Sequence, residues 1–273
     1  MPKVSVLMGV RLTDGRTGPL REAVESILGQ SLRDLELLVC PDGSSPQALA
    51  VLEALAAADP RLVLVAGDGG SALPQKLNRC LARARGEYLA RMDGDDWSYP
   101  QRLERQAAYL DSHPQVGFVG CCAELFDSRR GVYGQRLFPP APRAEDFRFN
   151  MPFLHPALVF RRQALEEAGG YSLSRWAVLC EDYDLLLRLY ALGWRGENLQ
   201  EKLIRYRVEP EDWKKRRMGH RLNEAVTRFC RFRQLGMLPR ALPYVVKPLA
   251  VGLLPHGMVE KLKEWRARGW KSC

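Results

Sequence analysis

An alternation of short apolar segments with amphipathic ones over the first hundred residues most strongly limits what this chain can fold into. The apolar segments have the length of strands, and the segments between them have the apolar spacing of helices. This rhythm is typical of βαβ units, so we expect an α/β fold with a mostly parallel sheet, helices on both faces, and ligands beyond the carboxyl ends of the strands. The predicted elements are Val4–Val10, Pro19–Leu28, Leu35–Cys40, Pro46–Ala58, Leu62–Ala66, Leu73–Ala84 and Tyr88–Met92.

The second hundred residues continue with predicted helices and strands around a proline-rich connection at residues 139–142. At 273 residues and 46% hydrophobic content, the chain is large enough for one substantial core. Seven cysteines, none in a Cys-x-x-Cys pair, predict reduced packing residues. The N-terminus has no apolar signal core, which favours a cytoplasmic protein. The predicted elements are Pro100–Leu110, Val116–Cys122, Pro156–Phe160, Gln163–Ala168 and Asp182–Leu192.

The net charge of +9 is concentrated in the last third of the chain, where Lys214–Arg217 form its densest run. No zinc-ligand, RNP or helix-turn-helix pattern accompanies these charges, so we predict no nucleic acid partner. Anionic lipid head groups attract basic segments, which favours peripheral contact with the inner face of the cell membrane. The apolar stretch 235–259 is interrupted by four prolines, which leaves open an interfacial segment or ordinary helix packing.

Three carboxylates stand within four positions where an apolar strand ends, at Asp93, Asp95 and Asp96. In an extended segment Asp93 and Asp95 project to one side, and the glycine between them lets a ligand approach the backbone. Mg²⁺ and Mn²⁺ accept carboxylate oxygens and leave other positions to substrate phosphates. The competing interpretations are a solvated acidic turn and a calcium loop, and the positions of Trp97 and Pro100 argue against the calcium loop.

A series of motifs follows in a fixed order along the chain: Ser5–Val10, Glu25–Ser31, Cys40–Ser45, Arg85–Asp96, Tyr99–Leu103, His155–Phe160, Gly169–Tyr171 and Glu181–Asp184. With these motifs the chain resembles glycosyltransferase family 2. The resemblance covers about residues 3 to 205 and implies the GT-A fold, a Rossmann-like sheet followed here by a basic helical C-terminal extension. It divides the chain into a catalytic domain at 1–205, with a nucleotide-sugar-binding half at 1–98 and an acceptor half at 99–205, and a tail at 206–273.

The resemblance assigns roles to individual residues. It implies that Asp42 binds the base of a UDP-sugar, that Asp95 holds Mn²⁺ or Mg²⁺, and that Asp93 contacts the ribose or the metal. Asp182 would be the catalytic base, although a carboxylate there also suits simple capping of the helix that follows. His155 is either a further metal ligand or a polar residue at a strand entrance. An Arg11-Leu12 pair replaces the family's usual aromatic–asparagine pair, which leaves the nucleobase open.

These roles predict an inverting transfer of a sugar from a nucleotide diphosphate donor to a saccharide or lipid-linked saccharide, in bacterial capsule or exopolysaccharide synthesis. The reaction needs no protein nucleophile, because Asp182 removes the proton of the acceptor hydroxyl as it attacks. One alternative is a sugar nucleotidyltransferase, although the loop from Arg11 to Pro19 lacks the lysine that would hold a triphosphate. Another alternative is a membrane-associated interaction protein that retains the fold.

Overall fold

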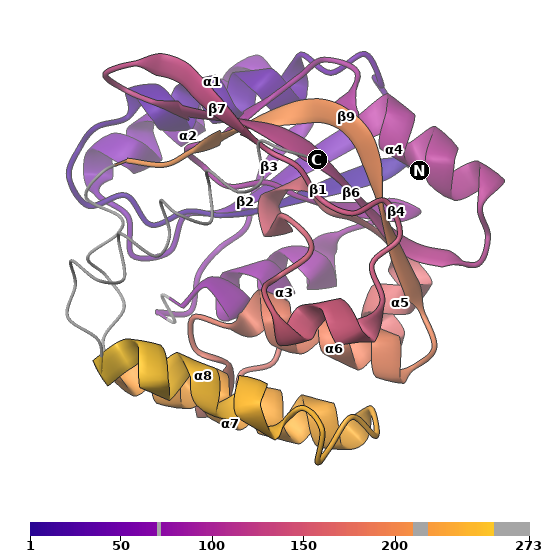
Figure 1. Ribbon diagram of the computed structural model, residues 1–273. Coiled ribbons are helices and arrows are strands. Elements are labelled where there is room, and N and C mark those ends of the chain that lie inside the picture. Colours follow the sequence, from indigo (N-terminus) through magenta and orange to yellow (C-terminus); the bar gives the residue numbers. More distant parts are fainter. Residues whose placement is uncertain (70–71, 210–217, 254–273) are drawn as a thin grey trace.

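The computed structural model describes residues 1–69, 72–209 and 218–253 and shows an α/β fold around one sheet (Figure 1). The strands lie in the order β3-β2-β1-β4-β8-β6-β9-β5, and β7 pairs with the outer part of β6. The strands are β1 (Val4–Gly9), β2 (Leu35–Cys40), β3 (Leu62–Leu64), β4 (Tyr88–Arg91), β5 (Trp97–Ser98), β6 (Val116–Asp127), β7 (Gly131–Arg136), β8 (Val159–Arg161) and β9 (Arg195–Arg207).

The first half of the sheet is parallel, as the βαβ rhythm predicts. Val4 of β1 lies opposite Leu35 of β2 and Tyr88 of β4, and β3 pairs parallel with β2. Strand β8 runs antiparallel between β4 and β6, whereas β6 and β9 pair in parallel. The carboxyl ends of β2, β1 and β4 therefore meet at one edge of the sheet, where ligands of open α/β sheets bind.

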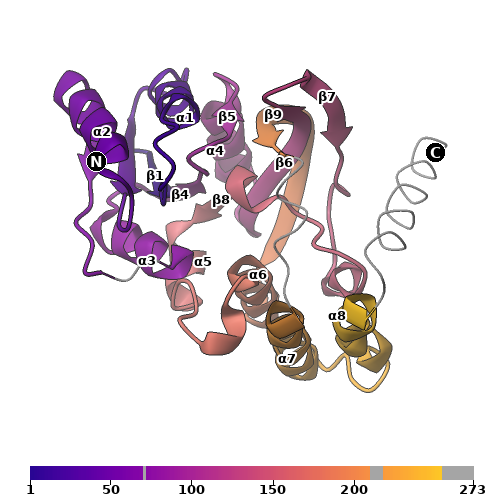
Figure 2. The same ribbon diagram turned by 90° about the vertical axis from the view of Figure 1, so that its left-hand side faces the viewer.

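Helices cover both faces of the sheet (Figure 1), because successive side chains of β1 point to opposite faces. Val4, Val6 and Met8 join one core with α1, α2 and α4, whereas Leu7 joins a second core with α3, α5 and α6. Helices α7 and α8 lie outside α6 (Figure 2). The helices are α1 (Gly18–Leu28), α2 (Pro46–Ala58), α3 (Leu73–Arg83), α4 (Arg102–Ser112), α5 (Arg162–Glu167), α6 (Glu181–Ala191), α7 (Met218–Gln234) and α8 (Leu242–Leu253), with 3-10 turns η1 (Ala144–Arg148), η2 (His155–Ala157) and η3 (Arg175–Ala177).

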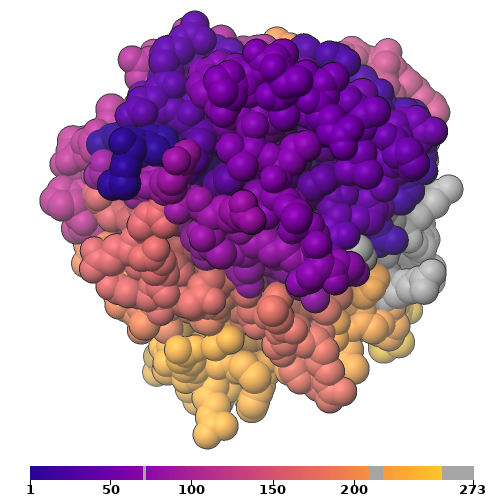
Figure 3. Space-filling model, turned by 180° about the vertical axis from the view of Figure 1, so that it is seen from behind, coloured from indigo at the N-terminus to yellow at the C-terminus, as the bar shows by residue number. Residues whose placement is uncertain are grey.

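The basic helical extension packs against the body of the protein. Phe232 of α7 is fully buried in the second core, and the Arg231 Nε donates to Asp184 of α6 at 2.8 Å. Seen from behind, α7 and α8 form the end of the molecule farthest from its first hundred residues (Figure 3). The predicted boundary at 205 falls near the end of β9 and stays a prediction. Residues 210–217, with the basic run Lys214–Arg217, and residues 254–273 lie outside the described residues.

No described helix combines the length with the apolar character needed to cross a bilayer. Pro248 stands inside α8, which is the more apolar of the two C-terminal helices. The six cysteines within the described residues are free thiols. Five of them are buried, as predicted for packing residues, whereas Cys230 is exposed and the prediction is wrong there.

Candidate active site

The acidic loop between β4 and β5 brings three carboxylates together. Asp93, Asp95 and Asp96 each offer an oxygen, and these oxygens all lie within 4.8 Å of one another. Gly94 lets this loop pack on the end of β1, since a Cβ atom there would lie 3.1 Å from the Cγ2 of Val10. Three anions so close together repel one another unless a cation or protons offset their charge.

Asp96 is the most buried member of this cluster, with only 1% of its surface exposed. Its Oδ1 accepts the backbone N–H of Arg207 at 2.8 Å, but its Oδ2 has no hydrogen-bond partner among the described residues. Burial raises the pKa of Asp96 well above its ordinary value, and the charges of Asp93 and Asp95 raise it further. A buried carboxylate oxygen without a partner beside two more carboxylates fits a hard divalent cation.

A buried arginine supplies positive charge behind the acidic loop. Arg91, at the end of β4, is 1% exposed, and its guanidinium donates to the carbonyl of Met92 and to the carboxylate of Asp93. A buried charge is costly unless it is paired, so this ion pair fixes the side chain of Asp93 at the start of the loop. A lone arginine in an otherwise apolar strand was the sequence signal for this role, and sequence reasoning missed it.

His155 lies apart from the three converging carboxylates. Its side chain is buried, and its Nε2 lies 2.9 Å from the hydroxyl of Tyr171. Burial lowers the pKa of His155 well below its ordinary value, and the charge of Arg91 lowers it further, so the ring is neutral at pH 7. The structure does not bring His155 into the carboxylate cluster, and its role as a metal ligand stays a prediction.

Asp42 follows β2 at the same edge of the sheet. Its Oδ2 accepts from Arg79 at 2.9 Å, and the backbone of Gly67 packs directly on its side chain, where a Cβ would lie 2.3 Å from the Asp42 Cγ. Nearby, the Nζ of Lys76 is buried and donates to the carbonyl of Val10 at 2.5 Å. Beyond β1 and β2, the partly exposed carboxylate of Asp42 can therefore contact a polar ligand, whereas the ammonium of Lys76 is buried and bonded to the protein.

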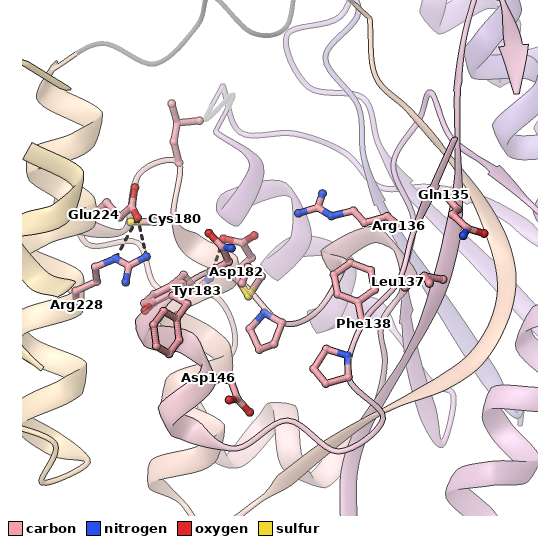
Figure 4. A pocket seen from close by; sticks show the side chains of 16 residues that line it. Gln135, Arg136, Leu137, Phe138, Asp146, Cys180, Asp182, Tyr183, Glu224 and Arg228 are labelled. Carbon is pink, nitrogen blue, oxygen red and sulfur yellow. Dashed lines mark hydrogen bonds and ion pairs between the residues drawn. The ribbon is translucent and has the colours of Figure 1, made fainter. Parts of the chain in front are cut away.

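Asp182 stands in the first turn of α6 and lines a pocket of about 910 Å³ (Figure 4). Its Oδ1 accepts the backbone N–H of Tyr183 at 2.7 Å, and the amino end of the helix favours its negative charge. Leu179, three residues earlier, has a φ of 60°, a strained conformation of the kind that clusters at active sites. The helix start thus holds a carboxylate at the wall of a cavity.

Glu181 precedes Asp182 but is 8% exposed and does not line the pocket. Its Oε2 has no hydrogen-bond partner among the described residues. Burial raises the pKa of Glu181 to about 7, and the charge of Asp182 adds to the rise. The charges of Arg91 and Asp93 also reach Glu181, which places the start of α6 close to the acidic loop. Sequence reasoning treated Glu181 only as the neighbour of Asp182.

The raised pKa of Glu181 predicts a pH-dependent cost in stability. Folding favours the protonated form of the Glu181 carboxyl. Its contribution to the free energy of unfolding is therefore full below pH 4.5 and is lost as the pH rises through about 7. Glu181→Gln removes this loss. We expect its unfolding free energy, relative to the unaltered protein, to be about 3 kcal/mol higher at pH 8.5 than at pH 4.5, at about 1.36 kcal/mol per pH unit. Urea unfolding at both pH values measures the difference, and the exposed Glu166→Gln is the control. A difference independent of pH would contradict the prediction.

Solved structures identify the class of this fold. The mannosyltransferase PcManGT of Pyrobaculum calidifontis, solved with GDP-Man and Mn²⁺, has 19% sequence identity and a TM-score of 0.61, over 98% of this chain and 81% of that one. TarS of S. aureus, solved with UDP-GlcNAc, has 17% identity and a TM-score of 0.68, over 90% and 73% of the two chains. The predicted α/β fold of GT-A glycosyltransferases is therefore confirmed.

Sequence comparisons identify the family within that class. The family model for glycosyl transferase family 2 matches residues 16–170. EpsE of Bacillus subtilis (strain 168), named as a glycosyltransferase, is 35% identical over 271 residues, which is 99% of this chain and 96% of EpsE. The amylovoran biosynthesis glycosyltransferase AmsE of Erwinia amylovora is 29% identical, over 92% of this chain and 94% of AmsE. The chain belongs to glycosyltransferase family 2, as its motifs predict.

Proposed function

We propose that this protein is an inverting, metal-dependent glycosyltransferase that moves a sugar from a UDP-sugar to a lipid-linked saccharide in cell-surface polysaccharide synthesis. The observation that carries the proposal is the position of Asp182, which lines a large pocket while its helix start lies within electrostatic reach of the acidic loop. The donor and the acceptor then approach the catalytic base, Asp182, from different sides. The amylovoran role of AmsE supports a function in polysaccharide synthesis. A relative from Escherichia coli supports the substrates, since it is named as a β-1,3-galactosyltransferase that uses UDP-Gal and an α-D-GlcNAc-diphosphoundecaprenol acceptor. It is 29% identical to this chain, over 79% of this chain and 78% of its own.

The donor site in this proposal is the edge where β1, β2 and β4 end. Asp93 and Asp95, with the free oxygen of Asp96, would hold Mn²⁺ or Mg²⁺, and a bound ion would offset charge on the leaving diphosphate. Asp42 accepts an N–H of the base, and Arg79 fixes the orientation of its carboxylate. The UDP-GlcNAc bound to TarS and the Mn²⁺ bound to PcManGT support these assignments.

A screen of sugar donors for release of nucleoside diphosphate tests the proposal. We expect release of UDP, dependent on Mn²⁺ or Mg²⁺, and a product whose anomeric configuration, read by NMR, is the inverse of the donor's. A sugar nucleotidyltransferase would release pyrophosphate from a nucleoside triphosphate instead. Retention of configuration would exclude the inverting mechanism, and thermal unfolding unchanged by every nucleoside diphosphate with Mn²⁺ would contradict the enzyme itself.

Gly67 gives a test of the base-binding role of Asp42. In Gly67→Ala the new methyl group overlaps the Asp42 side chain, so that carboxylate must move away from the base. We expect affinity for UDP in the presence of Mn²⁺ to fall about tenfold or more, as expected for a lost hydrogen bond to a charged group. Titration calorimetry measures it. Gly219→Ala, whose methyl group meets nothing within 4 Å, is the control. Equal UDP affinity in both variants would contradict the role of Asp42.

We also propose that α7 and α8 contact the cytoplasmic face of an anionic membrane. Basic side chains such as Arg221 and Arg233 stand on α7, and the apolar side chains of the two helices are partly exposed. Exposed apolar side chains next to basic ones are typical of interfacial helices. The exposed apolar residues are Met218, Leu222, Phe229, Leu242, Val246 and Leu253.

Vesicle flotation tests this membrane contact. The double variant Leu242→Asp/Val246→Asp should bind vesicles of phosphatidylglycerol and phosphatidylcholine about 100-fold more weakly, at about 1.5 kcal/mol for each of the two apolar side chains removed. Leu173→Asp, at an apolar side chain that is 64% exposed elsewhere on the protein, should bind as the unaltered protein does. Equal binding by all three proteins would refute the contact through α8.

A further inference from the structure

The guanidinium of Arg136 lies at the wall of the pocket that holds Asp182. Arg136 is the last residue of β7 and lines that pocket, and Figure 4 shows its side chain extending toward Asp182. The side chain of Gln135, the residue before it, extends away from Asp182 (Figure 4), as the alternation of side chains along a strand requires. The end of β7 therefore directs a positive charge into the space in front of Asp182.

The pairing of the strands relates Arg136 to the end of β9. Arg136 pairs with Ala123 of β6, the strand between β7 and β9. Tyr206 of β9 pairs with Leu125, two residues further along β6. Paired residues, and residues two apart in one strand, have side chains on the same face of a sheet. Arg136 and Tyr206 therefore project from one face, on either side of β6.

Tyr206 lies beside the acidic loop. The next residue, Arg207, donates its backbone N–H to Asp96 at 2.8 Å and its Nε to the carbonyl of Asp95 at 2.7 Å. Burial raises the pKa of Tyr206, the carboxylates of the acidic loop raise it further, and the charge of Arg136 lowers it. The acidic loop and Arg136 thus both act on this hydroxyl, so the guanidinium lies on the side of the pocket toward the acidic loop.

The positive charge of Arg136 is available to a ligand. The residue is exposed, and its Cζ lies 5.4 Å from the centroid of the Phe138 ring. No carboxylate among the described residues forms an ion pair with it. Arg228, which also lines the pocket, is instead buried and donates to Glu224 at 3.0 Å. An arginine that stacks on a ring without a carboxylate partner keeps the N–H groups of its planar fork for an oxyanion such as phosphate.

The proposed sugar transfer builds negative charge in this space. As the acceptor oxygen bonds to the anomeric carbon, the bond from that carbon to the β-phosphate oxygen breaks and leaves its electrons on that oxygen. The proton of the acceptor hydroxyl passes to Asp182. In an inverting transfer the leaving oxygen lies opposite the attacking one, and so on the side of the anomeric carbon away from the base. A cation already placed there stabilises the charge as it develops.

We propose that Arg136 binds the diphosphate of the donor and stabilises the leaving group as its bond to the sugar breaks. The proposal rests on the proposed function and adds a catalytic residue to it. Arg136 contacts the β-phosphate, the group that distinguishes UDP from uridine monophosphate (UMP). The hairpin of β6 and β7 thereby contributes to the donor site, although none of the family motifs in the sequence lies in it.

Calorimetric titration with UDP and with UMP, each in the presence of Mn²⁺, tests the proposal. In Arg136→Gln we expect affinity for UDP to fall about tenfold or more, as for a lost hydrogen bond to a charged group, and affinity for UMP to change less than about threefold. Arg136→Lys keeps the charge and should recover part of the lost UDP affinity. With the donor that the screen identifies, Arg136→Gln should release UDP about 100-fold more slowly, as for the loss of an oxyanion donor.

Arg130→Gln is the matched control, because it removes a positive charge from the same hairpin at a residue that pairs with Asp127 and does not line the pocket. It should bind both nucleotides as the unaltered protein does. Equal UDP affinity in Arg136→Gln and Arg130→Gln would overturn the proposal, and so would an equal loss of UDP and UMP affinity in Arg136→Gln. If the unaltered protein itself does not bind UDP with Mn²⁺, the proposed function fails, and this proposal with it.

Discussion

Asp182→Asn is expected to lower the rate of sugar transfer by 10² to 10⁴, the range for loss of a general base. The amide keeps the size and the position of the side chain but cannot take the proton of the acceptor hydroxyl. Binding of UDP with Mn²⁺ should change less than threefold, because Asp182 lines the pocket and the donor site lies at the strand ends. Single-turnover measurement of UDP release and calorimetric titration of UDP separate the two effects.

Glu181→Gln is the matched control for this experiment, since the two carboxylates are neighbours and either could be taken for the base. Asp182 lines the pocket, whereas Glu181 is buried and does not line it. We therefore expect Glu181→Gln to lower the rate much less than Asp182→Asn does. The reverse order of effects would assign the base to Glu181, whose pKa of about 7 would also suit proton transfer near neutral pH.

The sequence predicts the first half of the fold well and the second half less well, for physical reasons. Strand β2 begins and ends where the mostly apolar run Leu35–Cys40 does, because a strand buried on both faces is almost wholly apolar. Its one charged residue, Glu36, is paired with Arg85. Strand β7, at Gly131–Arg136, is largely exposed and forms by pairing with β6, so no apolar alternation indicates it. Strand β9 was missed likewise, since its thirteen residues are mainly polar and partly exposed.

The candidate site shows the same division between local and tertiary information. Asp42, Asp93 and Asp182 stand in short motifs at strand and helix ends, so local sequence is sufficient to select them. Their surroundings depend on contacts between distant segments. Glu224 and Arg228 belong to a basic stretch that resembles a solvated helix face, and only the packing of α7 on α6 brings them to the pocket wall.

Asp95→Asn tests the metal site and should abolish most of the stabilisation that UDP and Mn²⁺ provide. At a UDP concentration one hundred times its dissociation constant, binding stabilises the unaltered protein by about 2.7 kcal/mol. Even the loss of a residue that only supports a metal ligand lowers metal affinity 10-fold to 100-fold. Asp95→Asn removes a carboxylate of the cluster itself, so we expect the affinity for UDP with Mn²⁺ to fall about 100-fold. The variant would then keep only about 0.4 kcal/mol of stabilisation at the same concentration.

Thermal unfolding with UDP, with Mn²⁺, with both and with EDTA resolves this effect. The unaltered protein should gain stability from UDP only when the metal is present, whereas Asp95→Asn should gain little under any condition. Asp34→Asn is the control, because Asp34 is exposed at the opposite end of β2. Without ligands, Asp95→Asn should be at least as stable as the unaltered protein, since it removes one of three mutually repelling carboxylates. Full stabilisation of Asp95→Asn by UDP and Mn²⁺ would place the metal elsewhere, whereas a variant destabilised without ligands would show that Asp95 is structural.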